Sequence, residues 1–107
     1  MSTQVSSKQA PTLDSLRQQK EKVLQILSKY NAGNVRVFGS VARGDATPDS
    51  DIDLICDVDL SNIVGFYPAN AQMDLEALLG HPVQILPTTV LESKHMGPMI
   101  KMDLVEL

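Results

Sequence analysis

The chain of 107 residues is long enough for one domain with a modest hydrophobic core, and 43% of its residues are apolar. Nine basic and thirteen acidic residues give a formal net charge of −4, which argues against duplex nucleic acid as a partner and favours cations or a basic protein. The single cysteine, Cys56, rules out an internal disulfide and suits the cytoplasm, and no segment has the length and apolarity of a membrane span.

The first segment, residues 1–12, is polar and rich in serine, so we expect a disordered tail. From residue 13 to residue 30, apolar side chains then recur at helical spacing. Thr12 can cap the start of this helix, and Asn31 with Gly33 supplies a stop signal. We expect an amphipathic helix over residues 13–30 that covers one face of a sheet.

The next segment combines a short strand with a turn suited to phosphate. Residues 35–38 have the β-branched and aromatic composition of a buried strand, and Gly39 allows the backbone to turn sharply beside a ligand. Ser40 then begins a short helix, whose free amide groups and positive dipole end attract phosphate. Arg43 is either a second phosphate ligand or a surface cation, and the residues alone leave both readings open.

Two aspartates share one face of the following strand, which we expect over residues 51–58, because side chains alternate along a strand. The alternation places Asp51, Asp53 and Ile55 on one face, and Ile52, Leu54, Cys56 and Val58 on the other. Two adjacent carboxylates repel each other unless a cation neutralises them, and an all-oxygen ligand set favours Mg²⁺ bridging to substrate phosphates. We therefore predict a magnesium site at Asp51 and Asp53, and we interpret Asp57 as a solvated residue further along the same face.

After the second strand, the sequence pattern predicts a second helical region. Residues 63–80 are helical in two pieces, because Gly65 and Pro68 interrupt the pattern, and the clearer piece spans residues 69–79. Gly80 ends that helix.

A third strand and an apolar tail complete the chain. The strand covers residues 83–86 and ends at Pro87, and a short helix follows from Thr88 or Thr89 to Glu92. A break at residues 93–98 comes next, and the apolar-rich residues 99–107 pack either on the core or on a partner. Three strands follow from the sequence, and the tail leaves a fourth open.

The spacing of the two polar motifs carries a family resemblance. Gly39–Ser40, ten further residues and then Asp51–x–Asp53 resemble the signature of the minimal nucleotidyltransferase domains in the DNA polymerase β-like superfamily. The sequence around Arg43 extends the match, and the resemblance covers residues 13–107, which we treat as one domain. It implies an α/β fold like the polymerase β palm, with a short mixed sheet and helices mainly on one face.

The resemblance also implies an activity and a partner. Members of the superfamily transfer a nucleoside monophosphate, most often AMP from ATP, to an acceptor hydroxyl. Gly39, Ser40 and Arg43 would bind the phosphates, while Asp51 and Asp53 would hold Mg²⁺ and carry catalysis. The chain is too short for the extra domains that grip nucleic acids, so a protein acceptor is expected. Small stand-alone members resemble antitoxins that add AMP to a tyrosine of a helical, HEPN-type ribonuclease toxin.

One position departs from the family pattern. A third carboxylate usually stands on the strand that corresponds to residues 83–86, where this chain has Gln84. Glutamine carries no charge and cannot accept a proton at neutral pH, and loss of a general base costs on the order of 10²- to 10⁴-fold in rate. The alternative to an enzyme is therefore a weakened or inactive binding module that neutralises or scaffolds its partner by contact. The acceptor, the base preference and the oligomeric state stay open.

Overall fold

The computed structural model describes residues 9–107 and contains a four-stranded sheet of order β3-β2-β1-β4. The strands are β1 (Ala32–Phe38), β2 (Ile52–Val58), β3 (Val83–Pro87) and β4 (Val105–Glu106). β1 runs antiparallel to both β2 and β4, whereas β2 and β3 run parallel. The predicted mixed sheet is confirmed, and the C-terminal tail adds the fourth strand. Most of the predicted disordered tail, residues 1–8, lies outside the described residues, and Pro11 is buried.

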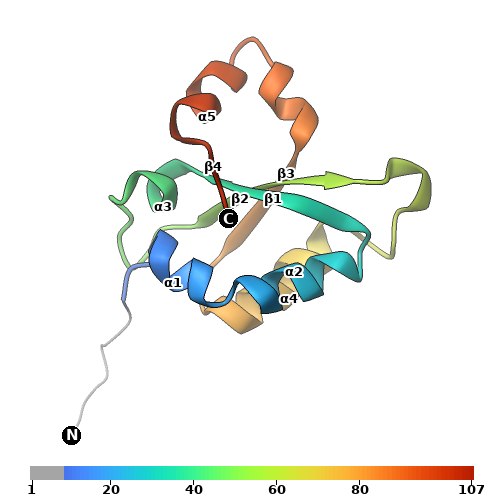
Figure 1. Ribbon diagram of the computed structural model, residues 1–107, viewed down its shortest axis with the longest axis horizontal. Helices are drawn as coiled ribbons and strands as arrows, with labels where there is room; N and C mark the ends of the chain where they lie inside the picture. Colours follow the sequence, from blue (N-terminus) through green and yellow to red (C-terminus); the bar gives the residue numbers. More distant parts are fainter. Residues whose placement is uncertain (1–8) are drawn as a thin grey trace, which may run out of the picture.

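Helices lie on both sides of this sheet (Figure 1). One face carries α1 (Leu13–Gln18), α2 (Lys20–Ser28) and α4 (Ala69–Leu79), and the other carries the 3₁₀ helix η2 (Thr88–Glu92) and α5 (Gly97–Asp103). The longest helices therefore share one face, as predicted. The short helix α3 (Gly39–Arg43) continues directly from β1. Within residues 9–107, no helix has the length and apolarity needed to cross a lipid bilayer.

The predicted helix over residues 13–30 is wrong in one respect, because it is broken into α1 and α2 at Gln19. Its start is as expected: Thr12 and Ser15 form a reciprocal capping box, with the Ser15 amide donating to Thr12 Oγ1 over 2.9 Å. Between Leu16 and Val23 every residue is polar, so a continuous helix would turn polar side chains toward the sheet. The break occurs in this run.

The turn after α2 differs slightly from the prediction. Asn31 adopts the left-handed conformation at φ 60° and reverses the chain, but Gly33 already lies within β1. A second left-handed residue, Asn34, accompanies a register shift between Gly33 and Arg36. This β-bulge explains why the strand begins earlier than its buried run of side chains.

The segment between β2 and α4 is mostly irregular. Asp59 caps the short 3₁₀ helix η1 (Leu60–Asn62), and the predicted helical piece over residues 63–68 is wrong, since this part of the chain forms turns. Gly65 has a φ of 60°, which a helix does not tolerate. In contrast, α4 has the predicted bounds and ends at Gly80 in the left-handed conformation.

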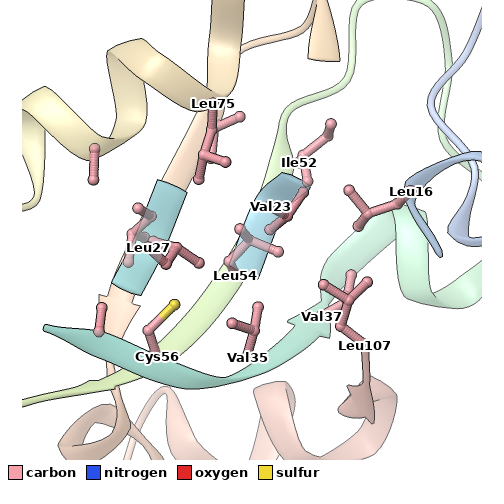
Figure 2. Close-up of a cluster of buried hydrophobic side chains, with 14 of the residues drawn as sticks. Leu16, Val23, Leu27, Val35, Val37, Ile52, Leu54, Cys56, Leu75 and Leu107 are labelled. Atoms are coloured by element: carbon pink, nitrogen blue, oxygen red, sulfur yellow. The ribbon is translucent and has the colours of Figure 1, made fainter. Parts of the chain in front are cut away.

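The main core lies between α1, α2 and α4 and the sheet (Figure 2). It includes the buried side chains Leu16, Val23, Leu27, Val35, Val37, Ile52, Leu54, Cys56, Leu75 and Leu107. Each fully buried aliphatic side chain contributes roughly 1.5–3 kcal/mol to folding. Cys56 is a buried thiol in the core, as predicted, and burial raises its pKa to about 12. Ile55, which does not belong to this core cluster, is also fully buried.

The C-terminal segment packs on its own domain, which decides between the two predicted roles of the tail. Gly97 and Pro98 begin α5 and do not interrupt it, because proline is tolerated in a first helical turn. The Leu107 amide donates to the Val35 carbonyl over 3.2 Å, and the Leu107 side chain is buried. Arg17 donates to the Glu106 carbonyl over 2.6 Å and to the Leu107 carbonyl over 3.3 Å. These bonds hold α5 and β4 against the sheet.

Candidate functional site

The predicted phosphate turn is formed by the junction of β1 and α3. Phe38 is extended, Gly39 has a φ of 77°, and α3 begins at once, with no side chain of the described residues 9–107 capping its N-terminus. The first amide groups of the helix are therefore available to a ligand. Ser40 stands in this first turn, where its hydroxyl is an additional donor.

The sheet register brings this turn to the aspartate motif. Phe38 is paired with Asp53 across the antiparallel strands β1 and β2. At Gly39, a Cβ atom would lie closer to Asp53 Oδ2 than atoms can approach without displacement. Gly39 thus serves two purposes: it permits the turn, and it leaves room for the Asp53 carboxylate.

The carboxylates of Asp51 and Asp53 repel each other, and the charge of Arg43 offsets this repulsion only in part. Asp51 is exposed and Asp53 is partly buried, and neither forms a hydrogen bond or an ion pair within residues 9–107. Burial, and secondly the charge of Asp51, raise the pKa of Asp53 to about 6, while Arg43 opposes the shift. A divalent cation would relieve this repulsion, so the donor set fits the Mg²⁺ that the family resemblance implies.

Gln84 lies beside this pair, in direct register with Asp53 across the parallel strands β2 and β3. The amide side chain therefore occupies the place where the family pattern predicts a third carboxylate. Accordingly, residues 9–107 contain no cluster of three histidine, cysteine or acidic side chains suited to a metal. Further ligands to an ion at Asp51 and Asp53 would have to come from water and from substrate phosphates.

Arg43 lies at the end of α3 and is held by two carboxylates. Its Nε is 3.1 Å from Asp45 Oδ2, and its Nη1 is 2.8 Å from Asp103 Oδ2. These hydrogen bonds, that to Asp103 first, raise the pKa of Arg43. Sequence reasoning missed Asp103, because it lies 60 residues from Arg43 in the chain and only the fold brings the two together.

A cavity of about 270 Å³ opens next to these groups. Its apolar walls are Phe38, Leu86, Met96, Met99 and Ile100, and its polar edge comprises Gly39, Arg43, Gln84 and Asp103. Residues of α5 form part of the apolar wall. In the sequence they belong to the apolar-rich C-terminal tail, but the pattern did not indicate where this tail packs. The structure thus places this largely apolar cavity beside the predicted phosphate-binding turn and the aspartate motif.

Comparison with known proteins now assigns the family. Residues 16–106 match the model of the nucleotidyltransferase domain. The chain belongs to this family. It is 30% identical, over 88% of its length and 96% of the relative's, to the "Putative protein adenylyltransferase MJ1379" of Methanocaldococcus jannaschii.

A solved structure described as that of a "putative minimal nucleotidyltransferase" supports the same assignment. It matches with a TM-score of 0.71 and 33% identity, and the match covers 90% of this chain and 96% of that one. The resemblance to minimal nucleotidyltransferase domains is therefore confirmed, as is the α/β fold. The family relationship supports a nucleotidyltransferase activity of the adenylyltransferase type.

Proposed function

We propose that this nucleotidyltransferase domain transfers AMP from ATP to a hydroxyl of a partner protein and depends on Mg²⁺. One observation carries the proposal: Asp53, which has no hydrogen-bond partner among the described residues, lies directly beside the turn at Gly39, and the charge of Asp51 acts on it. A structural role would give these carboxylates hydrogen bonds or counter-charges within the fold. Their arrangement is typical of a site that is completed by a charged ligand.

Each residue then has a defined part in the reaction. The amide groups at the start of α3 and the Ser40 hydroxyl bind the triphosphate. Arg43, at the end of the same short helix, adds a positive charge that attracts the phosphates. Asp51 and Asp53 would hold Mg²⁺, which when bound would neutralise charge on the phosphates. The acceptor oxygen forms a bond to the α-phosphorus, and the bond from that phosphorus to pyrophosphate breaks in line.

We further propose that the acceptor is a tyrosine of a HEPN-type helical ribonuclease toxin, which makes this chain an antitoxin acting in the cytoplasm. The relative's description as a protein adenylyltransferase favours a protein acceptor over a nucleic acid. The net charge of −4 is complementary to the basic surface of an RNA-cleaving partner. A neighbouring gene that encodes a helical protein with an R-x-x-x-x-H motif would supply the candidate acceptor.

A second function is favoured by one specific observation. Gln84 removes a charge and a proton acceptor from a position adjacent to Asp53, which suits a domain that binds nucleotide without efficient turnover. Such a domain would neutralise or scaffold its partner by contact. The two functions differ in whether the partner gains mass.

Intact-mass analysis tests the first function. The neighbouring protein and this chain are incubated together with ATP and Mg²⁺, and we expect one or more AMP units on the partner. The Asp51→Asn/Asp53→Asn variant should give no addition. Asp57→Asn, which changes the same face of β2 four residues beyond Asp53, is the matched control and should retain transfer.

The alternative makes the opposite prediction for the same samples. Unmodified partner, in a mixture where calorimetry detects Mg²⁺-dependent ATP binding and size-exclusion chromatography detects the complex, would contradict the transferase and support the binding module. Equal transfer by the Asp51→Asn/Asp53→Asn variant would show that the chemistry occurs elsewhere.

A further inference from the structure

The cavity beside Gln84 contains one carboxylate, that of Asp103, among the residues that line it. Gly39, Gln84 and Asp103 border the same space of about 270 Å³, and Gly39 lies against Asp53. The cavity therefore extends from the turn at Gly39, which lies against Asp53, to α5. A volume of this size suits a single inserted side chain, such as an aromatic ring, better than a whole nucleotide.

We infer that Asp103 accepts the proton of the acceptor hydroxyl, the role that Gln84 cannot perform. This inference rests on the proposed function and assigns it a catalytic residue outside the motifs. Arg43 and Asp103 are the charged residues that line the cavity, so Asp103 is the proton acceptor placed where an acceptor hydroxyl would enter.

The hydrogen bonds of Asp103 leave one oxygen free for this purpose. Asp103 Oδ2 accepts from Arg43 Nη1 over 2.8 Å, whereas no bond to Oδ1 occurs within residues 9–107. Asp45 binds Nε of the same guanidinium, so Arg43 divides its charge between two carboxylates. The Asp103 side chain is only 21% exposed, and the cavity that it lines has apolar walls beside its polar edge.

The fold holds Asp103 in place, although the residue is close to the C-terminus. It is the last residue of α5, and α5 contacts both α3 and β1. Immediately beyond it, β4 pairs with β1, and the buried Leu107 anchors the end of the chain. Arg17 binds the last two carbonyl groups from α1. A base needs a fixed position, and these contacts supply one.

Proton transfer to Asp103 accompanies formation of the bond to phosphorus. The O–H bond of the acceptor breaks, and its proton moves to Asp103 Oδ1. The acceptor oxygen forms a bond to the α-phosphorus of ATP, and the bond from that phosphorus to pyrophosphate breaks, with the electron pair leaving on pyrophosphate. Asp103 then returns its proton to water. The apolar walls from Phe38, Leu86 and Met99 would pack against the acceptor side chain.

Asp103→Asn tests the inference, with Asp59→Asn at an exposed cap as the matched control. AMP transfer to the partner protein should fall by about 10²- to 10⁴-fold in Asp103→Asn and stay unchanged in Asp59→Asn. Affinity for ATP with Mg²⁺, measured by calorimetry, should change less than about threefold, since proton transfer makes no contribution to binding. The residual rate of the variant should rise about tenfold per pH unit through neutrality, because hydroxide replaces the lost base.

A second variant separates loss of the base from damage to the fold. Gln84→Asp restores a carboxylate on the opposite edge of the cavity, so the Asp103→Asn/Gln84→Asp variant should recover at least about tenfold of the lost rate. No recovery, together with a pH profile parallel to that of the wild type, would overturn the role of Asp103.

Failure of the role of Asp103 can be distinguished from failure of the proposed function. Transfer by Asp103→Asn at the wild-type rate would overturn the role of Asp103 and leave the proposed function intact. A loss of ATP affinity that matches the loss of rate would also overturn it, since Asp103 would then act only by positioning Arg43. Absence of transfer by the wild-type chain would overturn the proposed function, and the role of Asp103 with it.

Discussion

Asp53 and Asp57 stand four residues apart on the same face of β2, and they have opposite environments. Asp57 is 52% exposed, yet it accepts hydrogen bonds from Thr88 Oγ1, from Asn34 Nδ2 at 2.9 Å and from Arg36 Nη2 at 3.0 Å. These bonds, that from Thr88 first, lower the pKa of Asp57. Asp53 is more buried, has no such partner within residues 9–107, and has a pKa raised to about 6.

The contrast separates a structural carboxylate from a ligand-binding one. At the Asp57 end, Arg36 Nη2 also binds Thr88 Oγ1 over 2.6 Å, so the cluster ties η2 to the sheet. At the Asp53 end, the charge of Arg43 offsets burial and the repulsion from Asp51 only in part, so the pKa of Asp53 stays raised. Without a ligand, the repulsion between Asp51 and Asp53 disfavours the folded state. Such locally unfavourable groups are typical of ligand-binding sites.

The largest effect is expected at Gly39, because its missing side chain leaves room for the Asp53 carboxylate at the start of β2. Gly39→Ala introduces a Cβ that collides with Asp53 Oδ2 at a φ of 77°, so it should destabilise the fold by about 2–3 kcal/mol and weaken ATP binding at least about tenfold. Gly44→Ala is the matched control, since Gly44 has a φ of 88° but no atom within 4 Å of the added Cβ. It should cost only about 1 kcal/mol.

Denaturant unfolding and calorimetry measure both quantities for the two variants. Equal destabilisation by Gly39→Ala and Gly44→Ala, with ATP binding preserved in both, would mean that backbone conformation alone matters at Gly39. The contact between Gly39 and Asp53 would then have no part in the site.

A smaller effect is expected from neutralising Asp53 in the absence of Mg²⁺. Because its folded pKa of about 6 lies above its ordinary value of 3.8, the folded state binds more protons between these values, and stability falls as the pH rises through this window. Asp53→Asn should therefore be more stable than the wild type at pH 7 by about 1–2 kcal/mol, after allowance for solvent screening.

The pH dependence provides the check on this prediction. The difference in unfolding free energy between Asp53→Asn and the wild type should shrink as the pH falls through this window and approach zero near pH 3, where the aspartate is mostly protonated in both states. Mg²⁺ should stabilise the wild type and not the variant. A variant less stable than the wild type at pH 7 would show that the Asp53 charge is compensated in the fold.

The sequence allowed these site residues to be predicted because their geometry is local. Gly39 and Ser40 follow a buried strand directly, and alternation along one strand aligns Asp51 with Asp53 whatever the rest of the fold does. The bounds of α4 were predictable for a similar reason, since a proline and a glycine flank it. The mixed sheet followed from the family resemblance.

The parts that could not be predicted depend on contacts between distant segments. Asp103 reaches Arg43 only because β4 returns beside β1 and places α5 over the site. Asp57 is exposed, as predicted, but its hydrogen-bond partners could not be predicted, because they come from a bulge in β1 and from η2. Neither contact leaves a periodic pattern or a motif in the sequence.

The smallest effect, and the opposite sign, is expected at Asp57. Its folded pKa lies below the ordinary value, so its contribution to stability is present at neutral pH and is lost as the pH falls below about 4. Asp57→Asn should destabilise the fold by less than about 1 kcal/mol at pH 7, because the carboxylate is half exposed. Unfolding of the wild type, Asp53→Asn and Asp57→Asn across pH 3–8 measures both aspartates in one experiment. If Asp57→Asn stabilises the protein, as Asp53→Asn should, then the hydrogen bonds around Asp57 do not stabilise its ionised form. The contrast between the environments of Asp53 and Asp57 would then be wrong.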